Sequence, residues 1–190
     1  MRKSWALAFP EISVDTWPQC ERLLPHALAC AGLINAYTLA LPEAAYLLNQ
    51  AAYYLNDHAQ YEQARPLFER ALALREQVLG TNHPATAISL NNLAELYRSQ
   101  GNYEQAQPLY ERALAISEQM LGPNHPHTAT SLNNLALLYD NQGNYEQAKP
   151  LLERALAIVE KTLGPNHPHT KLVRESYARL LENMKRKKKK

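Results

Sequence analysis

The chain has 190 residues, of which 46% are apolar, and a formal net charge of +2 from twenty basic and eighteen acidic residues. Only six glycines and two phenylalanines occur, while Ala, Leu, Glu, Gln and Tyr are abundant, so the composition favours helix throughout. No window approaches eighteen uninterrupted apolar residues, which excludes a membrane-spanning helix. These features predict a soluble all-α protein that forms one domain or one array.

The N-terminal segment, residues 1–48, precedes the regular part of the sequence. Its start imitates a signal peptide, but Pro10 interrupts the apolar run before it reaches the length of a signal, so we expect a cytoplasmic chain. Cys20 and Cys30 lie ten residues apart without a CxxC motif, which indicates reduced thiols. Residues 17–30, WPQCERLLPHALAC, align with residues 61–74 and predict a single helix over about 17–34.

Three repeats of 42 residues follow, at 49–90, 91–132 and 133–174, and the second and third copies are identical at thirty positions. Around the start of the second copy, Leu90, Leu93, Ala94 and Tyr97 fall at i, i+3, i+4 and i+7, the apolar stripe of a helix that we name helix A. A second apolar stripe runs from Tyr103 to about Leu121 and predicts helix B. The partial copy at 17–30 therefore matches a helix B.

The segments between the stripes carry turn and cap residues. Gln100-Gly101-Asn102 places glycine where helix A must adopt a left-handed turn and asparagine where helix B needs an N-cap, and residues 142–144 repeat this pattern. The segment 121–126, LGPNHP, ends helix B with glycine and begins the next helix A with proline. The sequence therefore predicts antiparallel helix pairs joined by short turns.

The C-terminal end predicts a capping helix and a basic tail. Val173, Tyr177, Leu180 and Met184 form a last apolar stripe, which predicts a solitary helix A over residues 168–184 that covers the open end of the array. Residues 185–190 are all basic, so the rest of the chain carries fourteen basic against eighteen acidic residues, a net charge of −4. A cationic run without aromatic residues is typical of a solvated extension.

No group of residues predicts catalysis, a cofactor or a metal site. The connectors contain His83, His125, His127, His167 and His169, but no thiolate or carboxylate stands at ligand spacing, so we interpret these histidines as turn and cap residues. The recurring glutamates lie on polar helix faces beside basic residues. The sequence contains neither a nucleophile elbow nor a glycine-rich phosphate loop. We therefore expect that the protein is not an enzyme.

The repeats resemble a known family. Ala94, Tyr97, Tyr103, Ala106 and Ala113 resemble the tetratricopeptide repeat, and the 42-residue period with NNLA, QGNYEQA, LYERALAI and LGPNHP resembles its kinesin-light-chain subtype over residues 49–174. The resemblance implies a right-handed α-solenoid of antiparallel helix pairs, whose A helices line a concave groove that holds partner peptides. The stretch beginning at Trp17 also resembles the junction before such repeats in bacterial nucleotide-binding signalling ATPases.

The paired asparagines of helix A are the main candidates for binding. Asn92 and Asn134, the second of each pair, should face away from helix B, either as part of a solvated polar face or as amides that pair with the backbone of an extended peptide. In the family that this sequence resembles, asparagine at that position holds ligand backbone. Gln50 and Ser176 occupy the equivalent places and depart from the pattern. The candidate groove residues are Gln50, Tyr53, Asn92, Glu95, Arg98, Ser99, Asn134, Leu137 and Asn141.

The sequence thus predicts a non-catalytic scaffold for protein–protein interaction that binds peptide or protein partners. The alternative is nucleic-acid or acidic-surface binding through the basic tail, which counterion release would make strongly salt-dependent. We expect nucleic acid to be the less favoured partner, and the chain to be a monomer or to self-associate weakly through its open repeat ends. The identity of the partner does not follow from the sequence.

Overall fold

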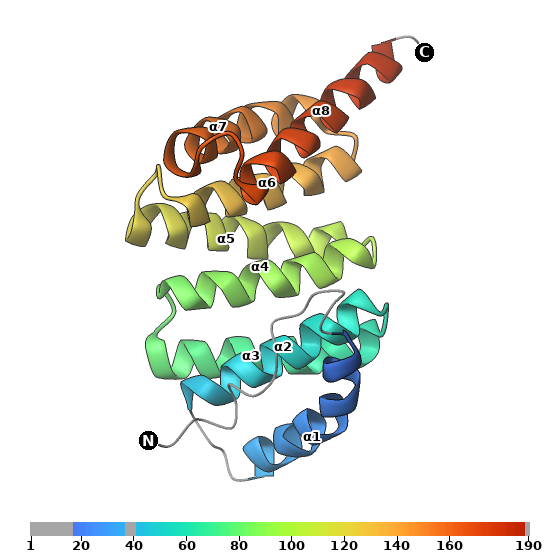
Figure 1. Ribbon diagram of the computed structural model, residues 1–190, viewed down its shortest axis with the longest axis vertical. Coiled ribbons are helices and arrows are strands. Elements are labelled where there is room, and N and C mark those ends of the chain that lie inside the picture. The colour runs from blue at the N-terminus through green and yellow to red at the C-terminus, as the bar shows by residue number, and fades with distance from the viewer. Residues whose placement is uncertain (1–16, 37–40, 189–190) are drawn as a thin grey trace. The chain divides into compact units, whose positions relative to one another are not determined.

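A computed structural model describes residues 17–36 and 41–188, and within these ranges all regular structure is helical (Figure 1). The expectation about an export signal falls on residues that lie outside the described part of the chain. No described helix is both long and apolar enough to cross a membrane. The helices are α1 (Trp17–Ala36), α2 (Pro42–Asp57), α3 (Tyr61–Leu79), α4 (Pro84–Ser99), α5 (Tyr103–Leu121), α6 (Pro126–Asn141), α7 (Tyr145–Leu163) and α8 (Pro168–Lys188).

The helices follow the predicted alternation of A and B and fall into two compact units. Helices α2, α4 and α6 are A helices, and α3, α5 and α7 are the B helices of the same repeats. Unit 1 ends at Leu96 and unit 2 begins at Tyr97, so the division falls within α4. In unit 1, α2 packs against α1 and α3; in unit 2, α6 packs against α5 and α7, and α8 packs on α7. The predicted all-α fold of helix pairs is confirmed.

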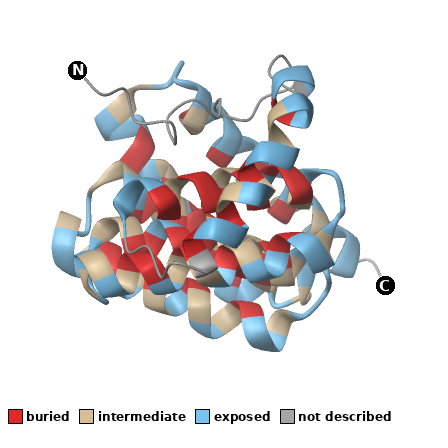
Figure 2. Cartoon of the chain, turned by 90° about the horizontal axis from the view of Figure 1, so that it is seen from below, coloured by how far each residue is buried: buried red, intermediate tan, exposed pale blue. Residues whose placement is uncertain are grey.

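Small residues hold the helices of each pair close together. In unit 2, Ala136 of α6 and Ala148 and Ala155 of α7 are fully buried, and in unit 1 Ala52, Ala64 and Ala71 occupy the same positions two repeats earlier and are also fully buried. Side chains of this size let helix axes approach to the short end of the usual packing distance. Buried residues accordingly gather where helices face one another (Figure 2). The larger side chains around the alanines in unit 2 are Leu132, Leu152, Ile158, Val159, Val173 and Leu180.

Every A-to-B turn ends its A helix in the same way. The backbone N–H of Gly143 donates to the carbonyl of Asp140 at 3.0 Å, and that of Asn144 donates to the carbonyl of Tyr139 at 2.8 Å. This pair of bonds is the Schellman motif, which requires a left-handed residue at its centre. Gly143 has φ 74°, and Ala59, which occupies the equivalent position in the first repeat, has φ 56°.

The asparagines after these glycines stand at the N-cap position, as predicted, but the expected side-chain cap is wrong. Asn102 and Asn144 have ψ of 70° and 57°, outside the extended region that capping requires, and neither side chain bonds to the first turn of its helix backbone. Their amide groups bond instead to the side-chain oxygens of Gln105 and Gln142. The cause is the preceding Schellman turn, which fixes the backbone of the asparagine before helix B begins.

The connectors between repeats are held by a threonine and a histidine. Thr128, which is fully buried, donates its hydroxyl to the carbonyl of Gly122 at 2.8 Å, and His125 Nδ1 accepts the backbone N–H of His127 at 3.1 Å. The same two bonds recur one repeat before and one repeat after, at Thr86 with His83 and at Thr170 with His167. The interpretation as turn and cap residues is confirmed for His83, His125 and His167, whereas the ring of His169 lies 3.3 Å from the hydroxyl of Thr130.

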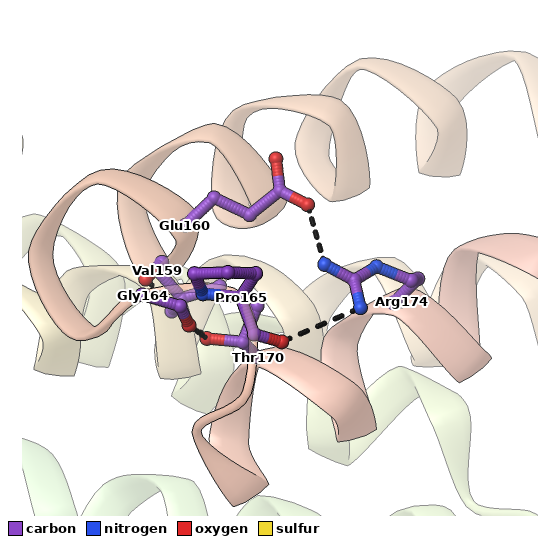
Figure 3. A network of polar contacts seen from close by, with 6 residues as sticks. All are labelled: Val159, Glu160, Gly164, Pro165, Thr170 and Arg174. Carbon is purple, nitrogen blue, oxygen red and sulfur yellow. Dashed lines mark hydrogen bonds and ion pairs between the residues drawn. The ribbon is translucent and has the colours of Figure 1, made fainter.

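Helix α8 covers the end of unit 2 and continues four residues beyond the predicted 168–184, through Lys188. Arg174 of α8 bonds to Glu160 at 2.7 Å and to the carbonyl of Pro165 at 3.4 Å (Figure 3). One repeat earlier the equivalent glutamate, Glu118, and the equivalent carbonyl, that of Pro123, are bound by Arg154 of the following B helix. Arg174 therefore supplies from α8 the contacts that a further B helix would make.

The strained turn at Ala59 gives a first prediction. A left-handed conformation costs a residue with a Cβ about 1–2 kcal/mol, while glycine is freer in the unfolded chain. We therefore expect Ala59→Gly to raise the free energy of unfolding by roughly 0.5–1 kcal/mol in urea denaturation. Gly143→Ala is the matched reverse change, because a Cβ there would meet no described atom within 4 Å, and it should lower stability. An unchanged or lower midpoint for Ala59→Gly would contradict this explanation.

His169 gives a second prediction, on pH. Burial lowers the pKa of His169 below its usual value, and the neighbouring His167 and His127 lower it further. Below about pH 6.5, His169 therefore binds a proton more readily in the unfolded chain than in the folded chain. The free energy of unfolding consequently falls as the pH falls through this range. When the pH is lowered from neutral to mildly acidic, we expect the melting temperature of His169→Gln to fall less than that of the unchanged chain. The exposed His26→Gln is the control, and coincident profiles for the unchanged chain and His169→Gln would refute the assignment.

Candidate peptide-binding surface

Each A helix is buried on two flanks and keeps one accessible stripe. On α6 the partly or fully accessible residues Thr130, Asn134, Leu137 and Asn141 recur at i, i+4, i+7 and i+11, so they share one face. Both sides of this stripe are buried, because α6 packs against α5, α7 and α8. We name these four residues the α6 stripe.

The same positions are accessible on the earlier A helices. In unit 1, α2 exposes Tyr46, Gln50, Tyr53 and Asp57, and the part of α4 that lies in unit 1 exposes Ile88, Asn92 and Glu95. The end of α4 adds Ser99, which is exposed, whereas Arg98 is partly buried and lies beside the stripe.

Eight of the nine sequence candidates therefore lie on these stripes, and Arg98 does not. Sequence reasoning missed Tyr46, Ile88 and Thr130, which stand one helical turn before Gln50, Asn92 and Asn134. The signal was available, since extending each predicted stripe by four residues towards the helix start reaches them.

The two asparagines of each pair have different surroundings. The first, Asn49 or Asn133, is 5% or 2% exposed and points away from the stripe, while Asn92 and Asn134 are partly accessible. In unit 1 the Nδ2 group of Asn92 donates to Oδ1 of Asn49 at 2.8 Å. Asn92 therefore uses part of its amide to satisfy a buried acceptor.

In unit 2, helix α8 has a serine in place of the second asparagine of the pair. Ser176 occupies the position equivalent to Asn92 and Asn134, but its hydroxyl donates to the carbonyl of Leu172 in its own helix. The buried Oδ1 of Asn133 has no hydrogen-bond donor within the described residues. Helix α8 is joined to α6 by another contact instead: the buried carboxylate of Asp140 accepts from Asn183 at 3.0 Å and lies 3.6 Å from Arg179.

The stripes of the two units differ in charge and hydrogen-bonding capacity. In unit 1, burial raises the pKa of the Tyr53 phenol, and the carboxylates of Asp57 and Glu95 raise it further, so the phenol stays protonated and can donate a hydrogen bond. The α6 stripe has no charge and offers two amides, a hydroxyl and a leucine. Such groups suit recognition of peptide backbone and apolar side chains rather than chemical reaction.

The described residues contain no group of three or more His, Cys, Asp or Glu side chains arranged to bind a metal ion. Cys20 is buried and Cys30 is partly buried in unit 1, and neither forms a disulfide bond within the described residues. Neither cysteine lies on a stripe.

Comparison with known proteins identifies the repeats. The tetratricopeptide repeat family matches residues 42–119, 91–161 and 127–189. Among solved structures, nearly identical tetratricopeptide-like repeats assigned to a kinesin light chain of Podospora anserina are 25% identical, with a TM-score of 0.67 over 92% of this chain and 87% of that chain. BtubC (BKLC) of P. vanneervenii is 21% identical, with a TM-score of 0.71 over 88% of this chain and 66% of that chain.

A more distant structure is the Sgt2 repeat domain of Aspergillus fumigatus, 22% identical with a TM-score of 0.52 over 75% of this chain and 82% of that chain. No curated protein matches the sequence. Scaffolds of this family generally mediate protein–protein interaction and are generally non-catalytic. The family matches reach from residue 42 to residue 189, and the solved structures share the helical solenoid and include kinesin-light-chain-like repeats. The chain therefore belongs to the tetratricopeptide repeat family.

Proposed function

We propose that this protein is a non-catalytic scaffold that binds an extended peptide segment of a partner protein at the A-helix stripes of unit 1 or at the α6 stripe of unit 2. The observation that carries the proposal is the α6 stripe, an accessible line of amide, hydroxyl and apolar groups on a helix whose other residues are mostly buried. Burial on both flanks fixes the backbone of α6, so Asn134 and Asn141 present their amides without a large loss of freedom on binding.

The peptide is expected to bind mainly through its backbone. An asparagine amide offers both a donor and an acceptor, which matches the alternating N–H and C=O groups of an extended chain. Leu137 of the α6 stripe and Tyr53 and Ile88 in unit 1 add apolar contact, and the last two are 42% and 40% exposed. Binding through such groups should depend weakly on salt, unlike the alternative of nucleic-acid binding through the basic tail.

Asn92 must serve both folding and binding, which gives a third prediction. Asn92→Ala removes the donor of the buried Asn49 Oδ1, and an unsatisfied buried acceptor costs about 1–3 kcal/mol of folding free energy. Ser176→Ala is the matched control, because it changes the equivalent position but removes only a bond within α8. Chemical denaturation should show the larger loss for Asn92→Ala. Equal losses would show that the bond between Asn92 and Asn49 contributes nothing to stability.

The proposed function is tested with the whole chain and a displayed library of random peptides. The affinity of the selected peptides should fall about fivefold for Asn134→Ala or for Leu137→Ala, because each change removes about 1 kcal/mol of contact. Peptides that bind to unit 1 should lose affinity by a similar factor when Tyr53 is changed to Ala. The controls are Lys161→Ala on α7 and Gln77→Ala on α3, two exposed residues of B helices. Selected peptides that bind all stripe variants with full affinity would overturn the proposal.

A further inference from the structure

The end of α8 forms a pocket beside the turn that joins α6 to α7. Helix α8 has 21 residues, whereas α2, α4 and α6 have 16 each. Its extra residues, 184–188, continue beside the turn that joins α6 to α7. Between them lies a pocket of about 320 Å³, which we name the turn pocket, lined by Gly143, Asn144, Tyr145, Glu146, Gln147, Met184 and Lys187.

A second hollow of about 340 Å³ adjoins the turn pocket and shares Gly143, Tyr145 and Lys187 with it. Arg186 and Asn183 complete its lining. None of the four residues of the α6 stripe lines either hollow, so this surface is separate from the one proposed above and does not depend on it.

Lys187 is held in a defined position at the centre of this surface. Its Nζ donates to the carbonyl of Gly143 at 3.1 Å and lies 5.1 Å from the centroid of the Tyr145 ring. A lysine ammonium group has three donors, and Gly143 accepts from one of them. The contact with the tyrosine ring is a cation–π interaction, which restrains the ammonium group further. Lys187 is exposed, as expected for the basic run, but it also contacts the turn between α6 and α7.

Arg186 adds a second cation, whose ion pair within α8 is weak. Its nearest carboxylate, Glu182, lies 3.9 Å away, and the side chains of Arg186 and Glu182 are 77% and 70% exposed. An exposed pair of this kind contributes little to stability. Arg186 can therefore turn to a ligand at small cost, whereas Met184 and the Tyr145 ring supply the apolar part of the lining.

We propose that the turn pocket and the hollow that adjoins it bind an acidic peptide segment, in which a carboxylate pairs with Lys187 and Arg186 and an adjacent apolar side chain contacts Met184 and Tyr145. The positive charge of the α8 end is complementary to such a ligand. The volume is at the small end of the range for ligand pockets, which suits one or two side chains. A run of nucleic-acid phosphates fits less well, because Glu146 lines the pocket and Tyr145 is its single aromatic residue for base stacking.

The test uses the full chain and two fluorescein-labelled peptides, one of alternating Glu and Leu and one in which Gln replaces every Glu. Fluorescence anisotropy should show binding of the Glu peptide and much weaker binding of its Gln counterpart. Lys187→Gln should weaken Glu-peptide binding about tenfold, the loss of one charge-assisted hydrogen bond. Lys185→Gln, an equal change of charge at an exposed residue that does not line the pocket, should weaken it by less than about twofold.

A variant that gains affinity distinguishes an effect on peptide binding from an effect on folding. Glu146→Gln removes the carboxylate that repels an acidic ligand, so it should tighten binding of the Glu peptide about twofold or more, which unfolding cannot imitate. Equal losses for Lys185→Gln and Lys187→Gln would overturn the proposal in favour of diffuse attraction to the basic end. It would also be overturned if a single-stranded oligothymidine bound more tightly than the Glu peptide and lost affinity equally with both lysine variants. Failure of these tests would leave the proposal for the α6 stripe intact.

Discussion

The close packing of an A helix against its neighbours, of α2 against α1 and α3 in unit 1 and of α6 against α5, α7 and α8 in unit 2, is the constraint on which the rest of the structure depends. Ala136, Ala148 and Ala155 are fully buried, and their small size brings α6 and α7 together along one flank, while α5 and α8 contact α6 elsewhere. A helix packed in this way leaves only one line of residues accessible. The stripe is therefore a consequence of packing, and its chemistry can vary without disturbing the core.

The repeated core contacts also vary in chemistry between copies. In unit 1, Arg75 donates to Ser89 at 2.8 Å and to the carbonyl of Ala85, and burial lowers the pKa of its guanidinium group. In unit 2 the equivalent pair is Ser117 with Ser131, whose hydroxyl oxygens are 3.4 Å apart, and one repeat later it is two buried valines, Val159 and Val173. The same packing position thus accepts charged, hydroxyl and aliphatic pairs. Polar pairs of this kind favour packing in which the two polar residues meet, so they help to specify which faces of two helices pack together.

The sequence was sufficient to predict features that depend on short spacing. Helical periodicity predicted the A and B helices, and the glycine of each QGN turn predicted the left-handed residue, because both signals lie within one or two helical turns. The bond between Asn92 and Asn49 was not predicted, since it joins residues 43 positions apart that become neighbours only when successive A helices pack. The same reason applies to Lys187, whose partner Gly143 lies 44 positions away.

The most direct test of the central claim is an NMR titration of the chain labelled with ¹⁵N-asparagine, with a peptide selected for binding as the ligand. If partners bind along the α6 stripe, the side-chain amide signals of Asn134 and Asn141 should shift, because their groups form the new hydrogen bonds. The signals of buried Asn133 and of exposed Asn166, in the connector before α8, should stay in place. Shifts at Asn166 with none at Asn134 or Asn141 would place the ligand elsewhere and contradict the account.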